Sequence, residues 1–545
     1  MMMEIKLVTV QEMQAVEKEA NETGFTYEMM MENAGRNLAE VIDEEYNYVE
    51  EDGICGLVGS GNNGGDTLVA LAVLADRGWP AYAYLVRPRP AEDVLIEQLK
   101  KNGGVIYQSW DDKEYRELKA LIAENAVILD GVLGTGTRLP LKQEVAQTLD
   151  TVRQLIADMD NSPVVVAVDC PSGVDCDTGQ AAEETIPADL TITMAAVKKG
   201  LFEFPANNLI GELIVVGIGL PKDGQDLLSW KAIRTFVPNA EWVRDRMPAR
   251  PTNAHKGTFG TALIVAGSAN YTGAAWLAGQ AAYRIGAGLV SLAVPEPLHA
   301  ALAGQFPEAT WLLLPEYEGF IAKEADEIIH QNMNRASALL IGPGFGLENE
   351  TLEFLRRFFN ARVHRSMGFI DKETDDASVS SFQLPPLVID ADGLKLLARL
   401  PDWPKLLPPL SVLTPHPGEM SVLTGLSKEQ IQSNRLEIAE RFSREWGHIV
   451  ILKGAFTIIA APDGLRAIIP VATPALARAG TGDVLAGLIV GLRAQGVDAF
   501  PAAVASAWIH AQAGWRAAEN LGNSASVLAG DVLKAVIQVI SEEIS

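Results

Sequence analysis

Cysteine is scarce in this 545-residue sequence, which contains only Cys55, Cys170 and Cys176. Three thiols cannot form a disulfide framework, and they are too few for a zinc site without histidine nearby. The sequence also lacks a charged-then-apolar signal peptide and any uninterrupted apolar run long enough to cross a membrane. We therefore expect a soluble protein of the reducing cytoplasm, with no membrane partner.

Positive charge is the second shortage. Lys and Arg number 44 against 70 Asp and Glu, which gives a net charge of −26 and a pI near 4.7. Such a chain repels the phosphates of nucleic acids and of anionic membranes, so these partners are excluded. Small anions can still bind where backbone amides converge.

Histidine is missing from the first 254 residues, and the first of the seven is His255. Any acid or base catalyst in that half must therefore be a carboxylate, Lys, Tyr or Cys.

Chain length, apolar residues and glycine are plentiful. A chain of 545 residues predicts two or three domains. Hydrophobic residues at 48% and 48 glycines favour an α/β architecture over a helical bundle. The proline-bearing segment 247–252 is the expected linker, and we assign domains to residues 1–240 and 241–545.

The first half opens with Thr9 and Glu12, which predict a capping box at the start of a helix. An apolar run at 54–58 predicts a buried strand, and a glycine-rich loop at 59–66 separates it from a helix at 67–77. In a doubly wound sheet such a loop lies at the carboxyl edge, where ligands bind. A flexible turn is the alternative, but it needs fewer hydrogen-bonding side chains.

Two aspartates, Asp130 and Asp169, each close a later apolar strand. We expect both carboxylates to share one crevice with the glycine-rich loop, although capping of a loop remains the alternative for either one alone. Lys198 and Lys199 are interpreted as part of a solvated face, with contact to a cofactor phosphate as the alternative.

Together with Met-Glu-Asn-Ala-Gly at 31–35, these segments resemble the NAD(P)HX epimerase family, or YjeF N-terminal domain, over essentially all of residues 1–240. The resemblance implies a Rossmann-like α/β/α sandwich that interconverts the R and S forms, at C6, of hydrated NADH and NADPH (NADHX and NADPHX). It implies Asp169 as the acid/base and a bound potassium ion held by Asn63, Asp130 and Ser172. Oxygen donors suit such a hard cation. The implied hydrate site consists of Asn62, Asn63, Gly64, Gly65, Asp66, Gly134, Thr135, Gly136, Thr137, Arg138, Leu139, Pro140 and Asp169.

The second half repeats the alternation of strands and helices without an internal repeat that links it to the first. We expect a second parallel-sheet domain, interrupted at 361–384 by a polar stretch that we predict to be a mobile insertion. Its predicted strands lie at 262–266, 288–294, 338–341, 386–389, 411–413, 449–452, 457–461 and 467–471.

Polar loops follow these strands, and the glycine-rich turn 479–482 can join them around one crevice. Its amides and the dipole of the helix that follows predict an anion site, with phosphate as the natural occupant. Asp483 would repel that anion, so we interpret it as a base beside a phosphoryl group. His416 stands between two prolines and is predicted to take part, whereas a structural or surface role is the alternative.

The segments Thr-Pro-His-Pro-Gly-Glu-Met at 414–420 and Ala-Gly-Thr-Gly-Asp-Val-Leu-Ala-Gly at 479–487 resemble the ADP/ATP-dependent NAD(P)HX dehydratases of the ribokinase-like superfamily, over about residues 245–540. The resemblance implies a ribokinase-like α/β/α sandwich. The implied hydrate contacts are Ala274, Gly344, His416, Pro417, Gly418, Glu419, Met420, Ser421, Val422 and Asp483. The implied ADP or ATP contacts are Lys453, Gly454, Ala455, Phe456, Thr457, Pro474, Ala475, Leu476, Ala477, Arg478, Ala479, Gly480, Thr481 and Gly482.

These resemblances imply a bifunctional repair enzyme, an isomerase joined to a lyase. It would epimerise the hydrates and dehydrate the S epimer at the expense of ADP or ATP, through a phosphorylated intermediate. Mg²⁺ would bridge nucleotide oxygens, since no dedicated protein cage is visible in the sequence. We also expect a homo-oligomer. The alternative is a ribokinase-like kinase of a vitamin precursor with a non-catalytic N-terminal binding domain.

Overall fold

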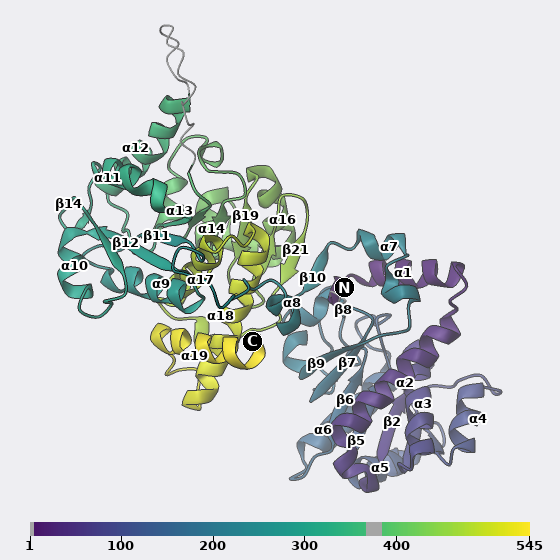
Figure 1. Ribbon diagram of the computed structural model, residues 1–545. Coiled ribbons are helices and arrows are strands. Elements are labelled where there is room, and N and C mark those ends of the chain that lie inside the picture. The colour runs from purple at the N-terminus through teal and green to yellow at the C-terminus, as the bar shows by residue number, and fades with distance from the viewer. Residues whose placement is uncertain (1–4, 367–383, 545) are drawn as a thin grey trace. The chain divides into compact units, whose positions relative to one another are not determined.

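The computed structural model describes residues 5–366 and 384–544, and its chain forms two compact units, Met1–Thr235 and Phe236–Ser545 (Figure 1). Each unit consists of a mostly parallel sheet with helices, which confirms the predicted α/β class. Most of the predicted insertion at 361–384 lies outside the described residues. The expected linker at 247–252 lies inside the second unit.

The first unit contains a seven-stranded sheet in the order β4-β3-β2-β5-β6-β7-β9. All of its neighbouring strands run parallel, which places their carboxyl ends along one edge. The strands are β2 (Ile54–Val58), β3 (Ala81–Leu85), β4 (Val105–Gln108), β5 (Val127–Gly131), β6 (Val164–Val168), β7 (Leu190–Met194) and β9 (Glu212–Val216). Outside this seven-stranded sheet, β1 (Ile5–Val8) pairs in parallel with β8 (Val197–Lys198).

Helices cover both faces of this sheet, and its strands are therefore buried on both sides. One apolar cluster joins α1, α2 and α3 to the sheet, and a second joins α5 and α6 to it. Figure 1 shows α2 and α3 side by side on the first face. The helices are α1 (Val10–Glu22), α2 (Tyr27–Tyr46), α3 (Asn62–Arg77), α4 (Val94–Lys101), α5 (Arg116–Glu124), α6 (Gln143–Ala157) and α7 (Leu228–Ala232).

The capping box predicted at Thr9 and Glu12 is present at the start of α1. The Glu12 amide donates to the Thr9 hydroxyl at 3.2 Å, and the Thr9 amide donates to the Glu12 carboxylate at 2.8 Å. Two backbone donors that a helix start leaves open are thereby satisfied.

Within the second unit the strand order is β13-β12-β11-β16-β17-β18-β19-β20-β21. The pairs from β13 to β19 are parallel, and β20 and β21 continue the sheet antiparallel. Strand β13 was not predicted. The strands are β11 (Thr261–Val265), β12 (Leu289–Pro295), β13 (Thr310–Leu314), β16 (Ala338–Ile341), β17 (Leu387–Ile389), β18 (Val412–Leu413), β19 (Ile449–Leu452), β20 (Ile458–Ala460) and β21 (Arg466–Ile468), with β14 (Glu316–Tyr317) and β15 (Phe320–Ile321) as a separate hairpin.

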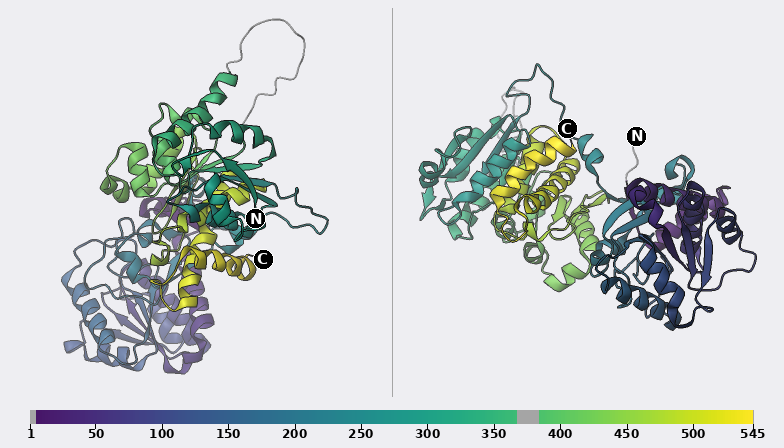
Figure 2. Two further views of the ribbon diagram at one scale, coloured as in Figure 1. Left: turned by 90° about the vertical axis from the view of Figure 1, so that its left-hand side faces the viewer. Right: turned by 90° about the horizontal axis from the view of Figure 1, so that it is seen from below.

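The helices of the second unit end in the pair α18 and α19, drawn in yellow in Figure 2. No helix in the two described ranges is both long and apolar enough to span a bilayer. The helices are α8 (Ala240–Arg244), α9 (Thr272–Arg284), α10 (Glu296–Leu302), α11 (Ala325–Asn332), α12 (Asn349–Ser366), α13 (Asp392–Leu397), α14 (Pro417–Thr424), α15 (Lys428–Ser433), α16 (Arg435–Trp446), α17 (Thr481–Ala494), α18 (Ala499–Leu521) and α19 (Ala529–Glu543), and the short strand β10 (Thr235–Val237) precedes them.

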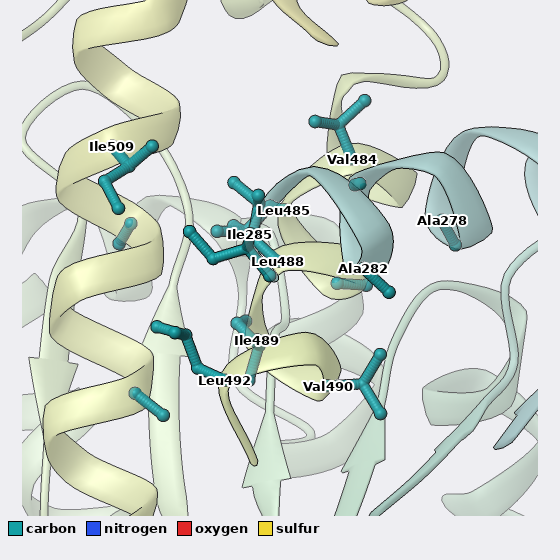
Figure 3. Packing of buried hydrophobic residues seen from close by; sticks show 14 of the residues in the cluster. Ala278, Ala282, Ile285, Val484, Leu485, Leu488, Ile489, Val490, Leu492 and Ile509 are labelled. Carbon is teal, nitrogen blue, oxygen red and sulfur yellow. The ribbon is translucent and has the colours of Figure 1, made fainter. Parts of the chain in front are cut away.

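Helix α17 is the buried centre of this unit. Figure 3 shows its Leu485, Leu488 and Leu492 packed among side chains of α9 and α18. Each fully buried side chain of this kind contributes roughly 1.5–3 kcal/mol. Gly487 brings α17 against α9, since a methyl group there would lie 2.2 Å from the Ala278 carbonyl oxygen. The core thus fixes the helix whose first turn carries the predicted anion site.

Candidate active sites

A cavity of about 490 Å³ lies at the carboxyl edge of the first unit's sheet. Residues that follow β2, β5 and β6 form part of its wall, as expected for a doubly wound fold. Side chains from α1, α2 and β8 complete it. Its wall includes Gln14, Glu17, Tyr27, Met31, Ser60, Asn62, Asn63, Asp66, Arg87, Leu133, Gly134, Thr135, Gly136, Asp169 and Lys198.

The segment Asn62 to Asp66, predicted as a loop, is the first turn of α3. Small residues permit this early start: a methyl group on Gly64 would lie 2.1 Å from the Gly59 carbonyl oxygen. Gly61 precedes the helix without a side-chain cap, so the first amides of α3 stay open to an anion. Gly64 and Gly65 serve close packing and are absent from the described cavity wall.

Asp169 directly follows β6 and has a φ of +65°, in the left-handed region. Its Oδ1 accepts three hydrogen bonds, from the Thr193 hydroxyl at 3.1 Å, the Met194 amide at 2.9 Å and the Lys198 ammonium. In the described part of the chain no hydrogen bond ends on Oδ2. Because Asp169 lines the cavity, Oδ2 is the oxygen that can exchange a proton with a ligand.

Lys198 is buried, and the interpretation of this lysine as part of a solvated face is wrong. Its ammonium donates to Asp169, to the Thr193 hydroxyl at 3.1 Å and to the Met194 carbonyl at 2.8 Å. These three acceptors match the three donors of an ammonium and compensate for its burial. Lys198 therefore orients Asp169 and has no donor left for a ligand.

Two further carboxyl groups, Glu17 and Asp66, face the same cavity. Burial raises the pKa of Glu17, the charge of Lys198 offsets part of that rise, and Asp169 adds to it. The pKa of Asp66 lies well above its usual value because of burial, with Asp169 and Glu17 adding to the shift. The cavity thus combines an ion pair with two carboxyl groups that tend to keep their protons.

The three predicted potassium ligands lie together beneath this cavity. The Ser172 amide donates to Asp130 Oδ2 at 2.7 Å, and the Asn63 side-chain amide donates to the carbonyls of Leu133 and Val168, each at 2.8 Å. Burial raises the pKa of Asp130 to about 6. Asp130 Oδ1 is buried without a hydrogen-bond partner among the described residues, so this set of oxygens fits a cation.

Only the first part of the predicted segment 134–140 lines the cavity. Gly134, Thr135 and Gly136 line the wall, whereas residues 137–140 are absent from it as described. The Thr137 hydroxyl donates to the Gly134 carbonyl at 2.9 Å, which closes the turn.

In the second unit, the predicted anion site begins at Gly480, whose φ of +90° suits glycine. The Thr481 hydroxyl donates to the carbonyls of Leu476 and Arg478, both at 2.9 Å, and so closes the loop before α17. No side chain caps this helix start. Asp483 is the third residue of α17, so its carboxylate stands in the first turn of this uncapped helix.

A buried network of charged side chains lies next to this turn. The Lys453 ammonium lies 2.7 Å from Asp390 Oδ1 and 3.7 Å from Glu419 Oε2. The Thr414 hydroxyl donates to the same Asp390 oxygen at 2.6 Å. A methyl group on Gly482 would lie 3.5 Å from the Lys453 nitrogen and 3.8 Å from Asp390 Oδ2, so the network reaches the anion site.

Asp483 has a pKa of about 7, raised from 3.8. Burial is the largest cause, Asp390 raises it further, Lys453 lowers it and Asp392 adds a smaller rise. Burial alone would lower the pKa of Lys453, but the carboxylates of Asp390 and Glu419 outweigh it and the pKa is raised. Asp483 is thus poised to exchange a proton near neutral pH.

His416 caps helix α14. Its Nδ1 accepts from the amides of Gly418 at 2.9 Å and Glu419 at 3.3 Å, and its own amide donates to the Glu419 carboxylate at 2.9 Å. Burial lowers the pKa of His416, partly offset by Glu419. An Nδ1 that accepts leaves the proton on Nε2, which lies 3.3 Å from Glu419 Oε1.

Other predicted hydrate contacts divide into two groups. Ala274 and Gly344 lie together, since a methyl group on Gly344 would be 2.8 Å from the Ala274 side chain. Met420, by contrast, is buried in the core, and the Ser421 hydroxyl donates to the Leu426 carbonyl at 2.7 Å. Val422 is exposed.

Two arginines hold the predicted nucleotide segments, and one of them, Arg435, was not predicted. Arg435 donates to the carbonyls of Ala455 and Leu452, and thereby fixes the loop after β19. Arg478, within the predicted set, donates to the Ala525 carbonyl. The Thr457 hydroxyl donates to the Gly454 carbonyl at 3.0 Å. Pro474, Ala475 and Leu476 form a short 3₁₀ turn that leads into 477–479.

Comparison with known proteins covers both units. A family model described as NAD(P)H-hydrate dehydratase matches residues 262–538, and one described as YjeF-related protein N-terminus matches residues 27–200. A protein of Moorella thermoacetica named bifunctional NAD(P)H-hydrate repair enzyme is 34% identical over 530 residues, 95% of this chain and 93% of its own. The chain belongs to the bifunctional NAD(P)H-hydrate repair enzyme family.

Other relatives agree with this family. A repair enzyme of the same name from Salinibacter ruber is 34% identical and covers 98% of this chain and 96% of its own. Among solved structures, the ADP/ATP-dependent NAD(P)H-hydrate dehydratase of Bacillus subtilis, co-crystallised with ATP and Mg²⁺, is 28% identical over 56% of this chain and 98% of its own, with a TM-score of 0.43. Because the Moorella and Salinibacter repair enzymes span both halves, the alternative of a vitamin kinase with a non-catalytic N-terminal domain is the weaker one.

Besides Arg435, three residues around the two sites were not predicted as site residues: Lys198, Asp390 and Glu17. Lys198 had one usable signal, an apolar run from Met194 that continues up to it. Asp390 stands at a recognised strand end but was not assigned to the site. Glu17 had no signal, since it lies on an amphipathic helix among exposed charged residues.

Proposed function

We propose that this protein repairs hydrated NADH and NADPH in two steps, one in each unit. The first unit interconverts the R and S epimers, and the second dehydrates the S epimer with ADP or ATP. The observation that carries this proposal is that each unit has its own aspartate site: Asp169 on a cavity, and Asp483 at an uncapped helix start. The two sites differ in chemistry, as the two steps require.

In the dehydration step, the hydroxyl at C6 of the hydrate first becomes a better leaving group. Asp483 takes the hydroxyl proton, which its pKa of about 7 permits, while the hydroxyl oxygen attacks the terminal phosphoryl group of the nucleotide. The bond from that phosphorus to the bridging oxygen breaks, and AMP leaves from ADP, or ADP from ATP. Backbone amides at this uncapped helix start would stabilise the charge that develops on that group. Phosphate then departs with the C–O electron pair as the ring nitrogen donates its lone pair, and loss of a ring proton restores the dihydronicotinamide.

Different segments of the second unit bind the nucleotide and the hydrate. Residues 453–457 and 474–482 hold ADP or ATP, and Ala274, Gly344 and the start of α14 hold the hydrate. The Lys453 ammonium lies close to the predicted anion site, since a methyl group on Gly482 would be 3.5 Å from its nitrogen. Bound Mg²⁺ would neutralise charge on the nucleotide phosphates, and the described residues include no cluster of three or more His, Cys, Asp or Glu that could hold it without the nucleotide.

In the epimerisation step, Asp169 exchanges a proton through Oδ2 while Lys198 holds its other oxygen. The dinucleotide hydrate enters the cavity between the start of α3 and residues 134–136. Asn63, Asp130 and Ser172 would hold K⁺, which would bring positive charge to the strand ends beside the substrate.

Location and assembly complete the proposal. The three cysteines are free thiols, which agrees with the reducing cytoplasm. The charge of −26 disfavours nucleic acids and membranes as partners. We expect a homo-oligomer, which sedimentation analysis of the purified chain would test.

The direct test uses an equilibrated mixture of NADHX epimers with ADP, Mg²⁺ and K⁺. We expect complete recovery of the dihydronicotinamide absorbance by the wild-type protein, whereas a protein that phosphorylates a vitamin alcohol and ignores the hydrate would refute the proposal.

A further inference from the structure

Glu17 lies on the wall of the first unit's cavity but outside the segment 27–200 that matches the epimerase-domain family model. It extends from α1, where Met13, Gln14 and Glu17 share one face of the helix and all line the cavity. An exposed position would be expected for a glutamate on an amphipathic helix such as α1.

Helix α1 is held firmly enough to place this carboxyl group. The Val10 amide donates to Asp177 Oδ1 at 2.8 Å, which anchors the first turn. Further along, the Glu19 carboxylate accepts the amides of Leu228 and Ser229, each at 2.8 Å. Both ends of α1 are therefore anchored to distant parts of the chain, which fixes the position of the Glu17 backbone beside the cavity.

Charged groups on three other elements face Glu17 across the cavity: Asp66 on α3, Asp169 after β6 and Lys198 on β8. Arg87, after β3, stands on the same wall and pairs with Glu144 at 2.6 Å. The ammonium of Lys198 donates its hydrogen bonds to Asp169, Thr193 and Met194. Glu17 thus lacks a direct ammonium partner there, and burial favours its protonated form.

Inversion at C6 needs two proton-transfer groups. The hydroxyl must leave one face of the ring with a proton, and water must add to the other face and lose a proton. A single carboxylate bound to a lysine cannot serve both faces at once. We propose that Glu17 is the second catalytic residue of the epimerase, the acid that works opposite Asp169. This inference rests on the proposed function.

Glu17 gives its proton to the C6 hydroxyl, the C6–O bond breaks, and water leaves with the bonding pair while the N1 lone pair forms the C6=N1 double bond. A water on the other face then attacks C6, and its proton passes to Asp169 Oδ2 as N1 regains its pair. The enzyme ends with Glu17 ionised and Asp169 protonated, which is the state needed for the opposite epimer, and solvent exchange resets it.

Asp66 is the competing donor, and the structure favours Glu17. Asp66 is 8% exposed within the wall of α3, and burial, Asp169 and Glu17 all raise its pKa. A proton held so strongly is a poor one to give at neutral pH. Glu17 is more accessible and has a longer side chain.

The test measures epimer exchange by the full-length protein without nucleotide, using NMR of NADHX. Glu17→Gln should slow exchange about a hundredfold or more, and Glu17→Asp should restore part of it. The wild-type rate should fall as pH rises and Glu17 loses its proton, and this limb should vanish in Glu17→Gln. Glu22→Gln, on the same helix with a 64% exposed side chain, is the matched control and should match wild type.

Folding of each variant is checked by its nucleotide-dependent dehydration of the S epimer and by its unfolding midpoint, both of which should be unchanged. Wild-type exchange rates in Glu17→Gln would overturn the inference. So would an alkaline limb that survives in Glu17→Gln but disappears in Asp66→Asn. A wild-type protein that exchanges no epimers would instead refute the proposed function itself.

Discussion

The two sites both bring an aspartate near a lysine, but the lysine has a different partner in each. In the first unit Lys198 bonds directly to Asp169, the proposed acid/base. In the second unit Lys453 bonds to Asp390, and Asp483 stands beside that pair with its pKa raised to about 7. The same residue types therefore produce an oriented carboxylate in one site and a near-neutral base in the other.

This difference fits the two reactions. Epimerisation is reversible and needs proton transfer on both faces of a ring, which suits a fixed carboxylate with a second acid across a cavity. Phosphoryl transfer needs a base for one hydroxyl beside amides that face an anion. The proposed base, Asp483, lies in the first turn of α17, beside the backbone amides of an uncapped helix start.

The largest expected effect comes from removing each aspartate. Asp483→Asn should lower nucleotide-dependent dehydration about 10²-fold to 10⁴-fold, because the hydroxyl proton has no acceptor, and should leave epimer exchange unchanged. Asp169→Asn should instead lower epimer exchange by a similar factor and leave nucleotide-dependent dehydration of the S epimer unchanged. Both activities are measured on each variant, and a variant that loses both would show that the sites are not independent.

A second comparison concerns two glycines that permit close packing, Gly64 in α3 and Gly487 in α17. Alanine at either position would press on a backbone carbonyl, at 2.1 Å and 2.2 Å respectively. Each substitution should destabilise its own unit by about 1–3 kcal/mol. Calorimetry should show one of two unfolding transitions shifted by each variant. Gly530→Ala is the control, since no atom lies within 4 Å of its added methyl group.

The third prediction concerns pH and the charges around Asp483. The base must be ionised, so dehydration by the wild type should rise with pH through about 7. Asp390 raises this pKa, so Asp390→Asn should shift the limb to lower pH, by about one unit. Asp392→Asn should shift it less. A limb that does not move in Asp390→Asn would remove Asp483 as the titrating group.

The smallest expected effect concerns the cation. Replacing K⁺ by a larger organic cation should slow epimer exchange several-fold, because Asp130 Oδ1 loses its partner. Asp130→Asn should make exchange slower and insensitive to this replacement. Equal potassium dependence in the wild type and in Asp130→Asn would exclude this site.

The sequence predicted the parts of the fold and the sites that depend on local order. Glycines before an apolar helix identified the turn at Asp483, and aspartates at strand ends identified Asp130 and Asp169. What it missed depends on distant packing. Lys198 can be buried because its ammonium donates to Asp169, 29 positions earlier, and to Thr193 and Met194. One short-range contact was missed as well: α3 can begin at Asn62 because Gly64, which has no side chain, packs against the Gly59 carbonyl, and helix propensities do not reveal this.

One measurement tests the central claim most directly: the time course of NADHX repair from mixed epimers by wild type and by Asp169→Asn, with nucleotide and Mg²⁺ in excess. Two independent aspartate sites predict a single fast recovery to completion in the wild type. In Asp169→Asn they predict a fast phase equal to the S fraction, followed by a slow phase set by spontaneous epimerisation. A single complete fast phase in Asp169→Asn, or no fast phase at all, would contradict the account.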